Sequence, residues 1–158
     1  MITKSIKERI KEYFFENPTV KLRLRQIERM LKLPFPSVVR YIKELEKEEI
    51  LKNEVMGNVK LYSSDRSSKT FLLEKKLHNI KSIYNSGLVE YLIQNHGNPT
   101  IVLFGSYSKG EDIEKSDIDI YVEMPKEEKI NLEKFEKKLN KSIQIFIYKN
   151  IKDIENKE

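Results

Sequence analysis

The sequence predicts an α+β protein of two small domains: a front domain of three helices plus a β-hairpin, and an α/β domain with a short mixed sheet behind it. Apolar residues recur at helical spacing up to about residue 48, and compact apolar runs of strand character follow residue 99. Residues 1–66 hold 15 Lys/Arg and 10 Asp/Glu, whereas residues 67–158 hold 15 of each. This uneven charge favours two modules, with domains at 1–66 and 67–158.

The front domain is predicted from periodic apolar positions and turn residues. Its first helix follows apolar residues spaced four apart: Ile2, Ile6, Ile10 and Phe14. A second helix is predicted over 24–31 and a third over 35–48, because prolines at 34 and 36 fit a first helical turn. Strands at 50–55 and 59–63 flank Met56-Gly57-Asn58, which is typical of a hairpin turn.

The back domain alternates helices with short apolar runs. Its helical stretch at 71–96 breaks near Asn85-Ser86-Gly87, where Ser86 is expected to cap a second helix. A further helix is expected over 131–139. The predicted strands are 100–104, 118–122 and 142–148.

The composition excludes several classes of function. The chain has no cysteine, so it has neither disulfides nor thiol chemistry nor Cys-ligated zinc. No stretch approaches the roughly 20 apolar residues that span a bilayer, and the first 15 residues do not resemble a secretory signal. We therefore expect a cytoplasmic protein with no membrane partner.

The front domain resembles the winged helix-turn-helix domains of archaeal and bacterial regulators over about residues 3–65. The similarity rests on the order of elements and on Leu33–Leu45, which matches the recognition-helix region. It implies DNA as a partner, contacted by Ser37, Arg40, Lys43 and Lys60. Winged helices also bind proteins, and the glutamates between 44 and 49 make the rear of the third helix acidic, so both partners stay open.

The chemically informative segment joins Gly105-Ser106 to Asp117-Ile118-Asp119. Gly105 directly follows a predicted buried strand, where a residue without Cβ lets the backbone approach a ligand and bind phosphate oxygens. Side chains alternate along a strand, so Asp117 and Asp119 share a face, about 6–7 Å apart. Two carboxylates there favour Mg²⁺, which binds oxygen ligands and substrate phosphates.

This segment resembles the nucleotidyltransferase superfamily that includes DNA polymerase beta, and specifically its minimal members. Ten residues separate Ser106 from Asp117, as in the family pattern Gly-Ser, about ten residues, Asp-x-Asp. The resemblance implies that Asp117 and Asp119 are catalytic and bind Mg²⁺, and that nucleotide phosphates lie at Gly105 and Ser106. Lys109 stands where an arginine is usual and Ser116 matches the common Ser-Asp-x-Asp form, so both join the nucleotide-binding set.

The third carboxylate of the family has no counterpart in the matching apolar context, Ile143-Gln144-Ile145. Gln144 is a possible weak third ligand, but a neutral amide cannot take a proton from an attacking hydroxyl. Glu123 and Asp153 are the candidate replacements.

Two functions therefore follow from the resemblance. The first is Mg²⁺-dependent transfer of a nucleotide monophosphate, AMP from ATP, to a hydroxyl acceptor. A partner protein is the expected acceptor, because minimal members often act as antitoxins that adenylylate a helical toxin. The second is a DNA-binding transcriptional regulator whose impaired nucleotidyltransferase domain only binds nucleotide or a partner. Gln144 supports this second function, because it stands where the family has its third carboxylate.

Overall fold

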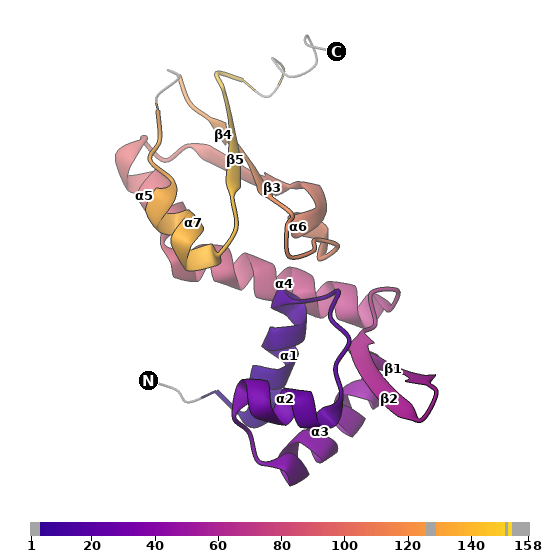
Figure 1. Ribbon diagram of the computed structural model, residues 1–158. Coiled ribbons are helices and arrows are strands. Elements are labelled where there is room, and N and C mark those ends of the chain that lie inside the picture. Colours follow the sequence, from indigo (N-terminus) through magenta and orange to yellow (C-terminus); the bar gives the residue numbers. More distant parts are fainter. Residues whose placement is uncertain (1–3, 126–128, 151, 153–158) are drawn as a thin grey trace. The chain divides into compact units, whose positions relative to one another are not determined.

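The computed structural model describes residues 4–125, 129–150 and 152, in two compact units (Figure 1). The first unit is Met1–Lys75 and the second is Lys76–Glu158. The division falls within one continuous helix, α4, Lys69–Ser86. The domain boundary between residues 66 and 67 stays a prediction.

The first unit consists of three helices followed by an antiparallel hairpin, in the order that the sequence predicted. The hairpin turn is at Gly57 and Asn58, also as predicted. The assignment of this unit to the winged-helix class remains a proposal. Its elements are α1 (Ile6–Glu16), α2 (Leu24–Leu31), α3 (Phe35–Lys47), β1 (Leu51–Met56) and β2 (Val59–Ser64).

Helix α1 begins at a capping box. The Ser5 hydroxyl accepts a hydrogen bond from the Glu8 backbone N–H, and the Glu8 carboxylate accepts one from the Ser5 N–H. Caps of this kind contribute about 1 kcal/mol to helix stability. The helix starts after Ile2, which lies outside the described residues. Its stripe buries Ile10 and Phe14 in the core of the first unit.

The turn between α2 and α3 is fixed by backbone conformation. Lys32 ends α2 in the left-handed region, at φ 51°. Pro34 then occupies the N-cap position of α3, and Pro36 lies in its first turn, where a missing N–H costs nothing. The predicted buried face of α3 is confirmed, with Val38, Ile42 and Leu45 all fully buried.

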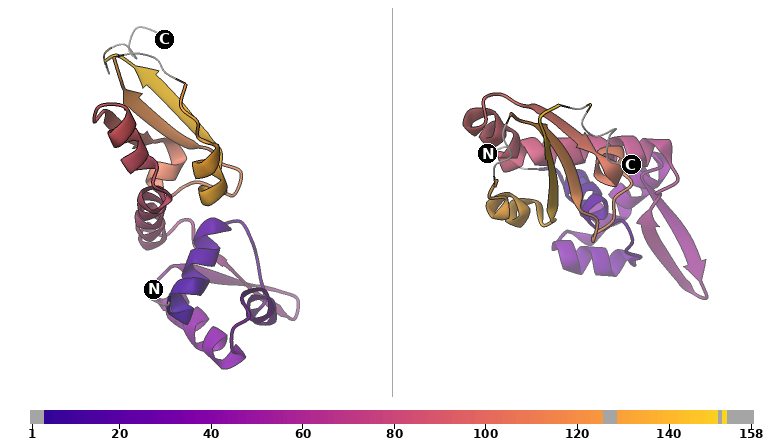
Figure 2. Two further views of the ribbon diagram at one scale, coloured as in Figure 1. Left: turned by 90° about the vertical axis from the view of Figure 1, so that its left-hand side faces the viewer. Right: turned by 90° about the horizontal axis from the view of Figure 1, so that it is seen from above.

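The second unit contains the end of α4, then α5 and a three-stranded mixed sheet. The strand order is β3-β4-β5, with β3 antiparallel and β5 parallel to β4, which confirms the predicted mixed sheet (Figure 2). The turn expected after the first strand is instead a short helix, α6. The elements are α5 (Leu88–Asn95), β3 (Thr100–Phe104), α6 (Gly105–Lys109), β4 (Ile118–Glu123), α7 (Glu133–Leu139) and β5 (Ile143–Tyr148).

The break between α4 and α5 lies where the sequence predicted it. Gly87 adopts φ 83°, a conformation that suits glycine, and the Ser86 hydroxyl accepts a hydrogen bond from the Leu88 N–H at 3.2 Å. Ser86 therefore caps α5 from the position before its N-cap, Gly87.

The sheet of the second unit is covered by helices on one face. Alternate strand residues such as Ile118, Ile120 and Val122 pack into one core with Leu88 of α5 and Phe135 of α7. The residues between them line the other face, which we call the open face. The exposed apolar side chains of the open face are Val102, Phe104 and Phe146, each 37–39% accessible.

In the described part of the chain, no helix combines the length and the apolar character needed to cross a membrane.

Candidate active site

Strand pairing brings the three segments of the motif together at one end of the sheet. Phe104, the last residue of β3, pairs with Asp119 of β4, and Asp119 pairs on its other side with Gln144 of β5. Gly105 and Asp117 adjoin this row, as the first residue of α6 and the residue before β4. The sheet register therefore places two carboxylates, an amide and the Gly-Ser turn side by side.

Gly105 is required by the position of Asp119. Its φ is +72°, and a Cβ built on it would lie 2.2 Å from Asp119 Oδ2. No side chain fits there while Asp119 keeps its position. The sequence suggested that the missing Cβ admits a ligand, and the structure adds a different reason: the carboxylate itself occupies the space.

Gln144 contacts one aspartate through its side chain and the other through its backbone. Its side-chain amide donates a hydrogen bond to Asp117 Oδ2 at 2.9 Å, while its backbone pairs with Asp119. The amide is exposed and both aspartates are half-buried, so the group faces solvent on the open face. Gln144, the possible third ligand, is therefore a hydrogen-bond donor to Asp117 in this structure.

The donor set is one that a magnesium ion accepts. Mg²⁺ commonly binds one or two carboxylates and completes its shell with water and substrate phosphates. Among residues 4–125, 129–150 and 152, no three His, Cys, Asp or Glu side chains cluster as metal ligands, so Glu123 does not replace the third carboxylate. Asp153 lies outside the described residues. Asp117 and Asp119 are the two side chains that fit this ion.

The other predicted nucleotide-binding residues lie around α6 and the loop after it. Ser106 follows Gly105 in α6 and is half-buried, whereas Lys109 is exposed at the end of that helix. The Ser116 hydroxyl accepts a hydrogen bond from the Ile113 N–H at 2.9 Å, which closes the turn before Asp117. Ser116 therefore stabilises the loop before Asp117, and its predicted contact with nucleotide remains a prediction.

A buried polar residue that the sequence gave no reason to choose supports α6. Asn79 of α4 is 2% accessible, and its amide donates to the Tyr107 carbonyl at 2.8 Å and to Asp112 Oδ1 at 2.7 Å. It therefore holds α6 and the loop after α6 to the same point on α4. The sequence around Asn79 contains no signal for this role, because its partners Tyr107 and Asp112 are distant in the sequence.

In the first unit, the residues predicted to contact DNA are on α3 and the hairpin. Ser37 lies in the first turn of α3 and is half-buried, while Arg40 and Lys43 are exposed on the same helix. Lys60 is exposed on β2, with its ammonium 5.2 Å from the Tyr62 ring centroid.

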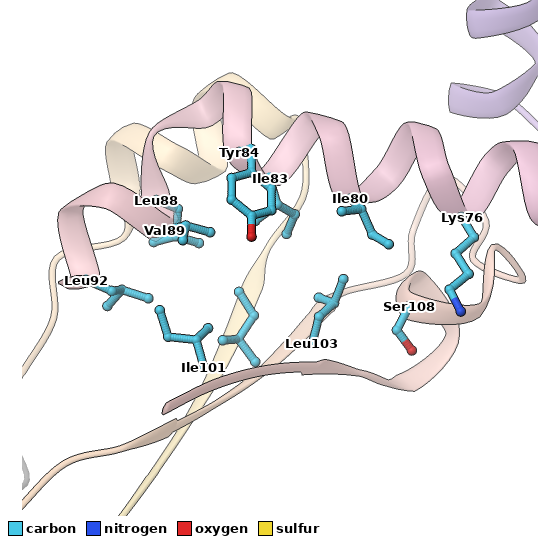
Figure 3. A pocket seen from close by; sticks show the side chains of 11 residues that line it. Lys76, Ile80, Ile83, Tyr84, Leu88, Val89, Leu92, Ile101, Leu103 and Ser108 are labelled. Carbon is cyan, nitrogen blue, oxygen red and sulfur yellow. The ribbon is translucent and has the colours of Figure 1, made fainter. Parts of the chain in front are cut away.

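A cavity of about 350 Å³ lies on the helix-covered side of the sheet (Figure 3). Figure 3 shows Lys76 and Ser108 at one end and Leu92 at the other, with Tyr84 and aliphatic side chains between them. Its sheet wall includes Leu103 and Ile120, which alternate along their strands with Phe104 and Asp119. The cavity is therefore separate from the carboxylates.

Comparison with known proteins agrees with this geometry for the second unit. Residues 86–157 match the family model described as the nucleotidyltransferase domain. No curated protein and no solved structure matches the chain. From the end of α4 onward, the chain is therefore similar to proteins that transfer nucleotidyl groups.

Proposed function

We propose that the second unit is a Mg²⁺-dependent nucleotidyltransferase that moves AMP from ATP to a hydroxyl acceptor. The observation that carries the proposal is the placement of Asp119: its carboxylate fills the space left by Gly105 and lies in register with Gln144. The Gly-Ser turn and the Asp119 carboxylate are therefore in close contact. Phosphate and metal ligands would thus be adjacent, as nucleotidyl transfer requires.

Each residue has a distinct part in the proposed reaction. Gly105, Ser106 and Lys109 would hold the β- and γ-phosphates, and Asp117 and Asp119 would hold Mg²⁺, which when bound neutralises charge on the phosphates. The acceptor oxygen bonds to the α-phosphorus, the bond to the β-phosphate oxygen breaks, and pyrophosphate leaves. Because Gln144 cannot accept a proton, the hydroxyl proton passes to water.

A hydroxyl of a partner protein is the proposed acceptor. The open face carries exposed Val102, Phe104 and Phe146, and the Phe104 and Phe146 ring centroids are 5.5 Å apart. Phe104 pairs with Asp119, so this apolar surface adjoins the carboxylates. Exposed apolar side chains beside a reactive site favour a protein over a small polar acceptor.

The substitution Asp117→Asn tests the enzyme directly. We expect it to lower transfer about 100-fold, because a preorganised charge at the reacting phosphate is lost. Purified protein is incubated with labelled ATP, GTP, CTP or UTP, Mg²⁺ and candidate acceptors, and release of pyrophosphate and transfer of label are followed. Glu111→Gln, an exposed change in the same unit, serves as the control and should retain wild-type activity. Nucleotide binding without turnover by the wild type would contradict this proposal.

DNA binding by the first unit is a second candidate function, favoured by the way that its acidic residues are paired. Lys7 of α1 forms ion pairs with Glu44 at 3.3 Å and Glu48 at 2.6 Å, and Arg40 pairs with Glu44 at 3.0 Å. The hydrogen bond from Arg40 holds the pKa of Glu44 below its ordinary value, and Lys7 acts in the same direction. Lys7 and Arg40 thus balance the negative charges of Glu44 and Glu48. The positive charge of Lys43 is exposed on the same helix.

The double substitution Arg40→Ala/Lys43→Ala is expected to weaken binding to a labelled DNA duplex. Losing two phosphate contacts should reduce the slope of log affinity against log salt by about 2. Fluorescence anisotropy between about 50 and 200 mM salt gives that slope. Lys69→Ala, an exposed lysine of the same unit outside α3, is the matched control. An unchanged slope, or no binding by the wild type at the lower salt, would rule out this use of α3.

A further inference from the structure

The ammonium group of Lys141 is enclosed by backbone carbonyls of the loop that leads into Asp117. Lys141 Nζ donates to the carbonyl of Ile113 at 2.6 Å and to those of Glu114 and Ser116 at 3.4 Å each. Three carbonyl dipoles that converge in this way repel one another unless a cation lies between them. The loop conformation therefore depends on this ammonium.

The charge of Lys141 is balanced by a buried carboxylate. Lys141 Nζ lies 3.4 Å from Asp112 Oδ2, and the two side chains are 11% and 2% accessible. Asp112 also accepts the hydrogen bond from Asn79 described above. Loss of one member of a buried ion pair leaves an uncompensated charge, so the pair constrains the loop strongly.

Lys141 is itself held by the end of α7. Asn140 closes that helix at φ 51°, and the Lys141 N–H donates to the Glu136 carbonyl at 3.3 Å. The Glu136 carboxylate accepts a hydrogen bond from the Ile143 N–H at 2.9 Å, at the start of β5. One short segment thus contacts the loop twice, through Lys141 at its carbonyls and through Gln144 at Asp117.

We infer that Lys141 is a positioning residue that sets the affinity of the Asp117–Asp119 site for a divalent cation. The inference rests on the proposed function of that site. Lys141 acts from behind the loop: it fixes the backbone up to Ser116, and the next residue is a proposed metal ligand. Residues that orient metal ligands commonly change metal affinity about 10–100-fold when they are replaced.

The test measures metal binding without turnover. Mn²⁺ is titrated into the wild type in the presence of the α,β-methylene analogue of ATP, which cannot be cleaved at the α-phosphorus, and free Mn²⁺ is followed by electron paramagnetic resonance. We expect Lys141→Met to raise the Kd for Mn²⁺ at least about tenfold. Lys141→Arg should restore part of the affinity. Lys137→Met on α7, where the lysine side chain is 74% accessible, should leave the Kd unchanged.

Folding is controlled separately. Circular dichroism is recorded for each variant, and Lys141→Met/Asp112→Asn removes both charges in case the single variant unfolds. A folded variant without Lys141 that binds Mn²⁺ as the wild type does would overturn the inference, as would failure of both variants to fold. If the wild type binds Mn²⁺ but transfers no nucleotide, the proposed function fails, and the Kd of the Lys141→Met variant still decides the inference. If the wild type binds no Mn²⁺, both fail.

Discussion

Gly105→Ala is expected to abolish nucleotidyl transfer and to destabilise the second unit. The new Cβ would lie 2.2 Å from Asp119 Oδ2, so the carboxylate must leave its position. Displacing a reacting group by about 1 Å costs about 100-fold in rate, and disturbing the phosphate turn as well brings the expected loss to about 1,000-fold. The left-handed φ of +72° adds about 1–2 kcal/mol of destabilisation.

The matched control is Gly87→Ala. Gly87 has a φ of +83°, but a Cβ there meets nothing within 4 Å, so this variant carries the backbone strain without the clash. Gly105→Ala should lose at least as much free energy of unfolding in urea as Gly87→Ala, and it alone should lose transfer. Equal activity in the two variants would show that the contact between Gly105 and Asp119 does not matter for the reaction.

Gln144→Asp is expected to raise the rate of transfer about 100-fold, because a positioned general base typically contributes at least that factor. Position 144 is in register with Asp119, and the Gln144 side chain reaches Asp117, so a carboxylate there supplies the proton acceptor that the amide lacks and a stronger oxygen ligand. Three neighbouring carboxylates repel one another in the absence of metal. The variant should therefore melt at a lower temperature than the wild type, and Mg²⁺ should recover the difference.

Gln144→Asn separates charge from size, because asparagine has the length of aspartate and the neutrality of glutamine. Initial rates of label transfer are compared for the two variants across a range of Mg²⁺ concentrations. Equal rates for the two variants would show that a carboxylate at position 144 takes no part in proton removal.

The local elements of this protein are largely readable from its sequence. Helix 24–31 and strand 100–104 were predicted at the bounds that the structure has, because both are short apolar patterns between clear turn signals. The short helix α6 was missed for a physical reason. It begins at a glycine with positive φ and is too short to show a helical period, so it resembles a turn.

The arrangement around the motif was less predictable than the motif itself. Spacing identified Gly105, Asp117 and Asp119, but only the register of three strands shows that Asp119 fills the space at Gly105. The contacts that hold the loop come from Asn79 and Lys141, which are far apart in sequence and have no local signature. Such contacts depend on tertiary packing, which periodicity does not report.

Helix α4 contributes residues to the cores of both units, so we expect the two units to fold cooperatively. Phe71, near its start, belongs to the first core, and Ile83, near its end, belongs to the second. A helix is nucleated once and then propagates at little cost, so either core can initiate it for both. Cleavage between residues 75 and 76 would create new helix ends with unsatisfied backbone groups on each fragment. Cleavage at the predicted boundary after residue 66 would keep the helix whole but remove Phe71 from the first core. With either cleavage, we expect the fragments to be less stable than the same units in the intact chain.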